Sequence, residues 1–539
     1  MGRDKRPDRL RKALATPYTD SHTVNVGLTP AMTSKLKIAG WVALGALAGG
    51  LTTLQFGATA RNTVSPLPLE EMQQLAAVFG MIKTDYVEPV DEKKLISDAI
   101  GGMVSGLDPH SVYFDKTTFK EFREGTTGKF VGVGIEIGME DGLVKIVSPI
   151  EGSPAFRAGL KSGDLITKID DTFVKGLTMD QAVKRMRGEP STKVVLTVFR
   201  KSENRSFPVT IVREEIRVQS VRAKIVEPGY GWVRVSQFQD RTVEDFVAKV
   251  NALYKEDPKL KGLVLDLRND PGGLLEGAIA ISAAFLPKDV TVVSTNGQLP
   301  ESKSIFKARA EDYTRRFGSD PLAKLPAALK TVPLVVLVNE GSASASEIVA
   351  GALQDHKRAT ILGGQTFGKG SVQTVRQLTA ETALKITTAR YYTPSGRSIQ
   401  ARGIVPDVMI DETEDGNVYA ALRVREADLE KHITSGQGKE EKDAAREKAR
   451  EEAIKKLEEA SNGNGKKADA PKPLPEFGSA EDFPLRQALN KLQNKPVAVS
   501  KTMTERKAEG TAAGASAAES ASAPVAPAPV PASTPASAR

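Results

Sequence analysis

Residues 332–373 constrain the fold more than any other segment, because an apolar run there turns abruptly into a helix. Residues 332–338 (VPLVVLV) are short and rich in Val and Leu, which predicts a buried strand. Six small residues follow at 341–346 (GSASAS), and residues 347–353 (EIVAGAL) have helical spacing. A helix N-terminus favours negative charge. The segment therefore predicts an α/β unit whose turn suits a nucleophile and its oxyanion.

Ser344, in this turn, has two interpretations. Ser344 and Glu347 have the S-x-x-E spacing of a capping box, which only starts a helix. Taken alone, the cap is the more common explanation. The rest of the chain has to decide between a cap and a nucleophile.

The composition of the chain sets outer limits on its function. The chain has 539 residues, a formal net charge of +8 and no cysteine. The length corresponds to about three to four domains. The lack of cysteine excludes disulfides, thiolate catalysis and Cys-based zinc sites. No basic stripe with interleaved aromatic residues stands out, so nucleic acid is not an expected partner.

A targeting segment is expected near the N-terminus. Residues 38–60 form the only long uncharged stretch; a basic segment, 1–37, precedes it, and Ala58-Thr59-Ala60 ends it. This pattern predicts a signal peptide or an uncleaved signal anchor, and hence possible membrane anchoring. We expect the cell envelope, in the periplasm or on the extracytoplasmic face of the inner membrane. Translation is expected to start at Met32, making 1–31 an upstream extension, with Met1 as the alternative start.

The remaining chain divides by pattern into five regions. Apolar residues at helical spacing predict an N-terminal helical region at 67–127, and a core is expected at 214–422. Dense charge predicts a largely solvated helical region at 423–495. Ala, Pro and Ser dominate 496–539, which predicts a disordered tail. Residues 302–325 are polar and are expected to form a loop.

Residues 128–213 form the fifth region, which combines short strands, two helices and a glycine loop, FVGVGI. This order resembles a PDZ domain. Such domains add an extended C-terminal peptide as a strand and hold its carboxylate with backbone N–H groups of the glycine loop. The residues expected to contact a peptide are Val131, Gly132, Val133, Gly134 and Ile135.

A second strand–turn–helix unit lies upstream of Ser344. Residues 260–268 predict a buried strand, residues 269–275 (NDPGGLL) a glycine turn, and residues 276–285 a helix. On its own this is an ordinary βα turn.

A serine nucleophile needs a base, and histidine fits poorly here. The four histidines are His22, His110, His356 and His432. His356 follows Ser344 by 356 − 344 = 12 residues, at the far end of the helix that Ser344 would begin. His110 lies in LDPHS, where Asp-Pro indicates a turn. A Ser-His-Asp triad is therefore poorly supported.

Lys369 is the alternative base. Burial disfavours the ammonium form of lysine, and Lys369 lies in a small, weakly charged setting, TFGKGSV. Gln373 is four residues further, so on an extended strand it shares a face with Lys369 and could orient it. The competing explanation is an exposed loop lysine.

A phosphate loop is a rival explanation for the same segment. Residues 363–369 match G-x-x-x-x-G-K, but Gly370 stands where Ser or Thr is required. Residues 371–378 also alternate like a strand, whereas a phosphate loop needs a helix. Nucleotide binding is therefore not expected.

Taken in order, the motifs LDPHS, FVGVGI, DLRNDPGGLL, GSASASEI, TFGKGSVQ and YYTPSGRSIQ resemble the carboxyl-terminal processing proteases, or tail-specific proteases. These are serine peptidases with a Ser-Lys dyad. The resemblance implies an α/β (α+β multidomain) fold: a crotonase-like ββα core, an inserted PDZ domain and an N-terminal helical region. It implies no cofactor and no metal.

The resemblance also implies roles for individual residues. Ser344 would be the nucleophile, Lys369 the general base and Gln373 its orienting partner. The oxyanion hole would combine the N–H of Ala345 with that of Gly272 or Gly273. In this family the PDZ domain gates the protease, and Arg187 could link it to the site. Ser191 stands where the family often has glycine.

Three functions remain open from the sequence. The first is an envelope endopeptidase that takes protein substrates with apolar C-termini, with an adaptor or activator protein and homo-oligomers as expected partners. The second is a non-catalytic PDZ scaffold in which Ser344 is only a cap. The third is a crotonase-like acyl-transfer enzyme, against which the PDZ region and the secretory segment argue.

Overall fold

The computed structural model describes residues 68–314, 319–414, 416, 421–438, 444–461 and 475–501. The predicted signal segment at 38–60 and the tail after residue 501 lie outside these ranges. Among the described helices, none is long and apolar enough to cross a membrane. The chain divides into two compact units after Glu92, and each is described by itself.

The predicted N-terminal helical region contains helices in both units. The first unit contains α2 (Leu69–Asp85), in which no side chain is buried. Around and after the boundary come α3 (Glu92–Ser105), β1 (Val112–Phe114) and α4 (Lys116–Thr127). Asp115 caps α4 by accepting the Thr118 N–H at 2.8 Å, and Gly128 ends it with a φ of +68°.

The region predicted to be a PDZ domain has its own core. Its sheet has the order β3-β4-β5-β7-β8, so β3 (Ile135–Glu140) is an edge strand. A separate pair, β2 (Lys129–Gly132) and β9 (Glu214–Arg217), joins the two ends of this region. The other elements are β4 (Leu143–Pro149), α5 (Pro154–Arg157), β5 (Leu165–Ile169), β6 (Thr172–Phe173), α6 (Met179–Met186), β7 (Lys193–Arg200), η1 (Lys201–Glu203) and β8 (Arg205–Val212).

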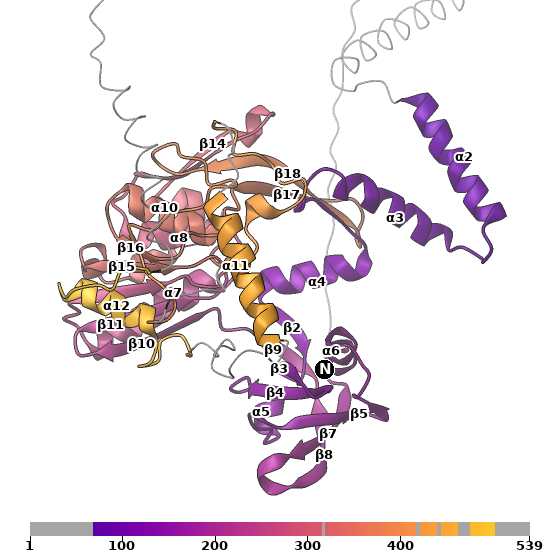
Figure 1. The fold of residues 1–539 in the computed structure, drawn as a ribbon, viewed down its shortest axis with the longest axis horizontal. Coiled ribbons are helices and arrows are strands. Elements are labelled where there is room, and N and C mark those ends of the chain that lie inside the picture. Colours follow the sequence, from indigo (N-terminus) through magenta and orange to yellow (C-terminus); the bar gives the residue numbers. More distant parts are fainter. Residues whose placement is uncertain are drawn as a thin grey trace, which may run out of the picture. The chain divides into compact units, whose positions relative to one another are not determined.

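The main sheet has the order β10-β11-β12-β15-β16-β19, parallel from β11 to β19. Figure 1 labels its strands β10, β11, β15 and β16. Its strands are β10 (Val221–Glu227), β11 (Tyr230–Val235), β12 (Gly262–Asp266), β15 (Leu334–Val338), β16 (Thr360–Gly363) and β19 (Val408–Met409). Parallel strands covered on both faces are apolar throughout, which explains why β15 was recognisable as a continuous Val and Leu run.

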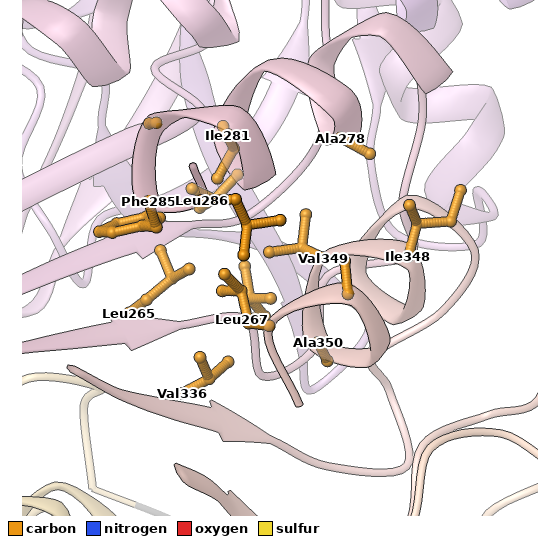
Figure 2. Packing of buried hydrophobic residues seen from close by; sticks show 14 of the residues in the cluster. Leu265, Leu267, Ala278, Ile281, Phe285, Leu286, Val336, Ile348, Val349 and Ala350 are labelled. Carbon is orange, nitrogen blue, oxygen red and sulfur yellow. The ribbon is translucent and has the colours of Figure 1, made fainter. Parts of the chain in front are cut away.

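Helices cover both faces of this sheet. Leu265 and Val336 point to α7 (Thr242–Glu256), α8 (Leu275–Phe285) and α10 (Ala345–Asp355), as Figure 2 shows for α8 and α10. Their neighbours Val264 and Val335 point to α12 (Phe483–Leu492) on the other face. Each fully buried side chain of this size contributes roughly 1.5–3 kcal/mol.

A second sheet is antiparallel throughout. It has the order β1-β18-β13-β14, with β17 also paired to β18. Its further strands are β13 (Thr291–Asn296), β14 (Ser304–Lys307), β17 (Ser371–Gln377) and β18 (Ala383–Tyr392). The loop expected at 302–325 in fact contains β14, which pairs with β13, and several short helices: α9 (Ala310–Tyr313), η2 (Pro300–Ser302) and η3 (Pro321–Lys324), followed by η4 (Ala327–Lys330).

The charged C-terminal region differs from the solvated helix expected from residue 423 onward. Within 421–438 the described helical residues form only 3-10 turns, at 421–422 and in η6 (Glu426–Asp428), and Glu426 is fully buried. The long polar helix α11 (Ala444–Ser461) follows. Charge density alone was misleading here, because buried hydrogen bonds hold Glu426 inside.

Candidate active site

Three loops meet where the parallel strands β12, β15 and β16 end. They are residues 267–274, 339–344 and 364–370. Ligands of parallel α/β sheets bind at the carboxyl ends of the strands. Hydrogen bonds join the loops: the Ala343 N–H donates to the Asp270 carbonyl at 2.9 Å, and the Phe367 N–H donates to the Ser342 carbonyl at 3.0 Å. The three sequence motifs thus form one site.

Ser344 lies at the N-cap of α10 with a φ of +55° and a ψ of −109°. A non-glycine residue in such a conformation is strained, and strain of this kind is concentrated at functional sites. Helix caps usually have extended backbone angles. The unusual backbone of Ser344 therefore favours a functional role over a cap alone.

The candidate oxyanion donors lie beside Ser344. Gly272 is packed so tightly that a Cβ there would lie 2.8 Å from the Ala345 nitrogen and from Ser344 Cβ. The Gly272 N–H is already used, because it donates to Asp270 Oδ1 at 2.8 Å. Within the described residues, the N–H groups of Ala345 and Gly273 make no hydrogen bond. Of the two predicted glycines, Gly273 is therefore the better donor.

Asp270 forms hydrogen bonds with residues on both sides of Ser344. Its carbonyl accepts the Ser346 hydroxyl at 2.9 Å as well as the Ala343 N–H. The side chain is completely buried, and burial raises its pKa to about 8. Its Oδ2 atom has no hydrogen-bond partner among the described residues.

Glu347 connects the nucleophile turn to the base loop. Its Oε2 accepts the Ser344 N–H at 2.7 Å and the Lys369 N–H at 2.9 Å. Its Oε1 accepts the Gly368 N–H at 2.7 Å and the Thr366 hydroxyl. The carboxyl is fully buried, which raises its pKa to about 7 although these hydrogen bonds oppose the shift.

Lys369 is mostly buried, and its pKa is lowered. Burial is the largest cause, and the nearby ammonium of Lys385 is the second. The carboxylates of Glu426, Glu347 and Asp108 act in the opposite direction. A lysine whose ammonium form is disfavoured can act as a general base near neutral pH.

Within the described part of the chain, no hydrogen bond joins the Ser344 hydroxyl to the Lys369 amine. Catalytic contacts are often long in substrate-free enzymes and shorten when substrate binds. The backbone of both residues is already fixed by Glu347, so a change of side-chain rotamer is the smallest motion that would join them.

Among the described residues, the Gln373 side chain forms hydrogen bonds with Ser371 and Thr387 and none with Lys369. Its Nε2 donates to Ser371 Oγ at 2.9 Å and to Thr387 Oγ1 at 3.3 Å. Lys369 precedes β17, and the register between β17 and β18 shifts between Val372 and Gln373. The predicted contact depended on strand alternation from Lys369 to Gln373, but Lys369 lies before the first residue of the strand.

Sequence reasoning missed a cluster supplied by the LDPHS motif. Asp108 accepts the Ser111 hydroxyl at 2.6 Å and the Thr387 hydroxyl at 3.1 Å, and so connects to Gln373. His110 Nε2 lies 2.7 Å from Glu426 Oε2. The motif itself was the available signal, but its partners are distant in sequence. No group of His, Asp or Glu within the described residues is arranged to hold a metal ion.

The predicted peptide-binding residues occupy different parts of the glycine loop. Val131 and Gly132 lie in β2, Ile135 begins the edge strand β3, and the Val133 side chain is buried in the domain core. Gly134 has a φ of +80° and is packed against Ser153. The free edge of β3 leaves room for an added strand.

Two further predicted features of this domain can now be located. Arg187 donates to Glu124 Oε2 on α4 at 3.0 Å, and its guanidinium lies 5.2 Å from the centre of the Phe130 ring. Ser191 has a φ of +66°, a conformation that glycine adopts without strain. This backbone geometry explains why glycine suits position 191.

Together, the fold and the site define a serine-type peptidase with an inserted PDZ domain. The model "Peptidase family S41" matches residues 229–410, "PDZ domain" matches 131–211, and "Activating protease CtpB N-terminal domain" matches 48–118. The chain belongs to peptidase family S41. The predicted resemblance and the multidomain α/β fold class are confirmed.

Similar proteins align with about two thirds of the chain. The "Carboxy-terminal-processing protease" of Bartonella bacilliformis is 43% identical over 378 residues, which are 69% of this chain and 82% of that protein. A "Probable CtpA-like serine protease" of Staphylococcus aureus is 38% identical over 354 residues, 66% of each chain.

Two solved structures are also similar. The photosystem II D1 C-terminal processing protease is 31% identical with a TM-score of 0.37, covering 60% of this chain and 84% of that chain. The PDZ domain of the Vibrio cholerae Carboxy-Terminal Protease, solved with a peptide, is 31% identical with a TM-score of 0.16. It covers 17% of this chain and 99% of that chain.

Proposed function

We propose that this peptidase is a cell-envelope endopeptidase that recognises apolar C-terminal tails of proteins and cleaves them with Ser344 as nucleophile and Lys369 as general base. The observation that carries the site assignment is the shared carboxylate of Glu347, which receives the backbone N–H groups of both residues. One buried group thereby fixes the two motifs at one place.

The proposed reaction follows from the positions of these groups. The neutral Lys369 amine takes the hydroxyl proton while Ser344 Oγ attacks the scissile carbonyl carbon. The N–H groups of Ala345 and Gly273 stabilise the resulting oxyanion. The tetrahedral intermediate collapses, Lys369 returns the proton to the leaving amine, and an acyl-enzyme remains. Water, deprotonated by Lys369, then hydrolyses the acyl-enzyme.

Cleavage of an unfolded protein with an apolar C-terminus tests the dyad. Protein lacking residues 1–60 is compared with its Ser344→Ala and Lys369→Ala variants, with a metal chelator as control. We expect cleavage by the parent protein only, unchanged by the chelator. Undiminished cleavage by either variant would refute the dyad. A cell extract is then added as a source of activator. If every form of the protein still binds the tail and none cleaves it, the PDZ scaffold is favoured.

Recognition of tails is assigned to the edge strand β3 and the glycine loop. A peptide added to β3 would continue the sheet, with its carboxylate near the N–H groups of residues 131–135. Binding of a fluorescent peptide with a free apolar C-terminus should be lost when that C-terminus is amidated. Equal binding of the amidated peptide would contradict carboxylate recognition.

The envelope location is supported by the uncharged segment at 38–60 with its preceding lysines. Cell fractionation of tagged full-length protein should place it in the membrane or periplasmic fraction, and removal of 1–60 should keep it in the cytoplasm. N-terminal sequencing of the purified protein distinguishes a cleaved signal from an anchor, and start at Met32 from start at Met1.

Homo-oligomers and an adaptor or activator remain the proposed partners. The apolar side chains of α2 support self-association, because Leu69, Met72 and Leu75 are 69%, 48% and 45% exposed. The mass of the protein lacking 1–60, measured by light scattering, should exceed that of a monomer. Met72→Asp together with Leu75→Asp should reduce it; a monomeric parent protein would contradict self-association.

A further inference from the structure

The loop that carries Lys369 is held from behind by buried polar groups to which the proposed reaction assigns no role. Their centre is Glu426, which is 0% exposed and lies in the 3-10 turn η6. Its Oε2 lies 2.7 Å from His110 Nε2, and its Oε1 accepts the Gln400 Nε2–H at 2.7 Å. Both carboxylate oxygens are therefore engaged, and the charge is not exposed to water.

These groups hold the backbone on both sides of Lys369. The Gly370 N–H donates to Gln400 Oε1 at 2.9 Å. Gln400 therefore connects Glu426 by hydrogen bonds to the residue that follows the base. The Glu426 N–H donates to the Phe367 carbonyl at 3.1 Å, two residues before the base. A side chain at Gly370 would overlap the backbone of Gln400, so the loop and Gln400 are in close contact.

The carboxylate of Glu426 also acts on the base, because it raises the pKa of Lys369 and so opposes the effect of burial. The groups that act on the Lys369 ammonium are the carboxylates of Glu426, Glu347 and Asp108, and the ammonium of Lys385. Among the three carboxylates, Glu426 has the largest effect. A buried charge acts strongly because water screens it poorly.

We propose that Glu426 is a positioning residue for the base: with Gln400 and His110 it fixes the backbone around Lys369, and its buried negative charge acts on the Lys369 side chain. The proposal rests on the assignment of Lys369 as general base. It gives the LDPHS motif a function, since His110 anchors Glu426 from a position 316 residues away in sequence. The base loop is thus completed by groups that are distant in sequence within the second unit.

The Glu426→Gln variant separates charge from geometry. Glutamine keeps an oxygen that can accept the Gln400 hydrogen bond, but it lacks the negative charge. Without that charge the ammonium of Lys369 is less stable, so the acidic limb of the kcat/KM–pH profile should move to lower pH. A purely structural role would change kcat without moving this limb.

Two variants test the remaining parts of the proposal. Lys385→Met removes the opposing positive charge, so it should move the same limb to higher pH. Gln400→Leu leaves the Gly370 N–H unpaired, so kcat should fall about tenfold while KM stays within about twofold. Asp355→Asn, which removes a carboxylate at the far end of α10, should leave the profile unchanged.

The experiment uses protein lacking residues 1–60 and an internally quenched peptide, with thermal unfolding of each variant as a check on folding. An acidic limb that stays in place in Glu426→Gln overturns the proposal. If that variant does not fold, a wild-type kcat in Gln400→Leu overturns it instead. Retained cleavage by Ser344→Ala or Lys369→Ala would refute the dyad itself, which keeps the two failures distinguishable.

Discussion

The backbone N–H groups of Ser344 and Lys369 share one acceptor, Oε2 of Glu347, at 2.7 and 2.9 Å. Charge-assisted hydrogen bonds of this length are strong and directional. The relative position of the proposed nucleophile and base is therefore set by the backbone.

Replacing Glu347 by alanine should lower kcat by roughly 100-fold, because the two loops lose their common anchor and small misplacements of reacting groups are costly. The change is measured with an internally quenched peptide. Glu340→Gln is the matched control: Glu340 is also buried in this turn, but its side chain pairs with Arg423. A kcat for Glu347→Ala within threefold of the parent value would show that the anchor is dispensable.

Replacing Gly273 by alanine should abolish activity and destabilise the fold by about 2 kcal/mol or more. Gly273 has a φ of +145°, and a Cβ there would overlap the Phe238 carbonyl oxygen. Alanine keeps the backbone N–H, but the clash displaces it from the oxyanion position, and the loss of one such donor lowers kcat by roughly 100-fold or more. Gly142→Ala is the control, because Gly142 also has a positive φ but a Cβ there would meet no atom within 4 Å. Similar kcat losses in both variants would argue against a specific role for Gly273.

Asp270 should make stability depend on pH. Its pKa is raised from 3.8 to about 8 in the folded protein. Its contribution to stability is fully present below about pH 4 and is lost as the pH rises through about 8. Asp270→Asn cannot ionise, so its Tm relative to that of the parent protein should be higher at pH 9 than at pH 5. Parallel Tm curves for the two proteins between these pH values would contradict burial of an ionisable carboxyl here.

The C-terminal helix α12 should detach when its buried ion pair is broken. Arg268 donates to both oxygens of Asp482 at 2.9 and 2.7 Å, and the two side chains are 4% and 2% exposed. Asp482→Asn should destabilise the protein by about 3 kcal/mol, because the Arg268 charge loses a buried partner. Arg486, on the same helix, forms an exposed pair with Glu414, and Arg486→Ala should cost under about 1 kcal/mol.

Chemical denaturation measures the total effect of the Asp482 substitution, and hydrogen exchange of the α12 amides localises it. Equal effects of the buried and the exposed substitution would contradict the assigned role of Arg268.

Much of the fold was predictable because the core elements follow simple periods. The strands β12 and β15 are continuous apolar runs, and α8 and α10 follow small-residue turns, so all four were recognised close to their observed bounds. The strand β14 was missed, because its residues form a strand only through pairing with β13.

The site was predictable where one motif carries one role. Ser344 and Lys369 each stand in a distinctive local pattern, and the structure brings their loops together. The bridge through Glu347 was visible only as a helix cap, since its second loop lies 22 residues further on. The contact of His110 with Glu426 depends on the complete fold, so no local pattern could reveal it.

The strand pair β2 and β9 has a consequence for how such chains diversify. The two ends of the inserted domain leave the core side by side, with Lys129 opposite Arg217 and the Val218 N–H bonded to the Gly128 carbonyl at 3.0 Å. Residues 133–213 can therefore be exchanged for another domain with adjacent termini without re-routing the chain. Tail selectivity and peptide-bond chemistry are thus separable modules, and new specificities can be grafted onto an unchanged catalytic body.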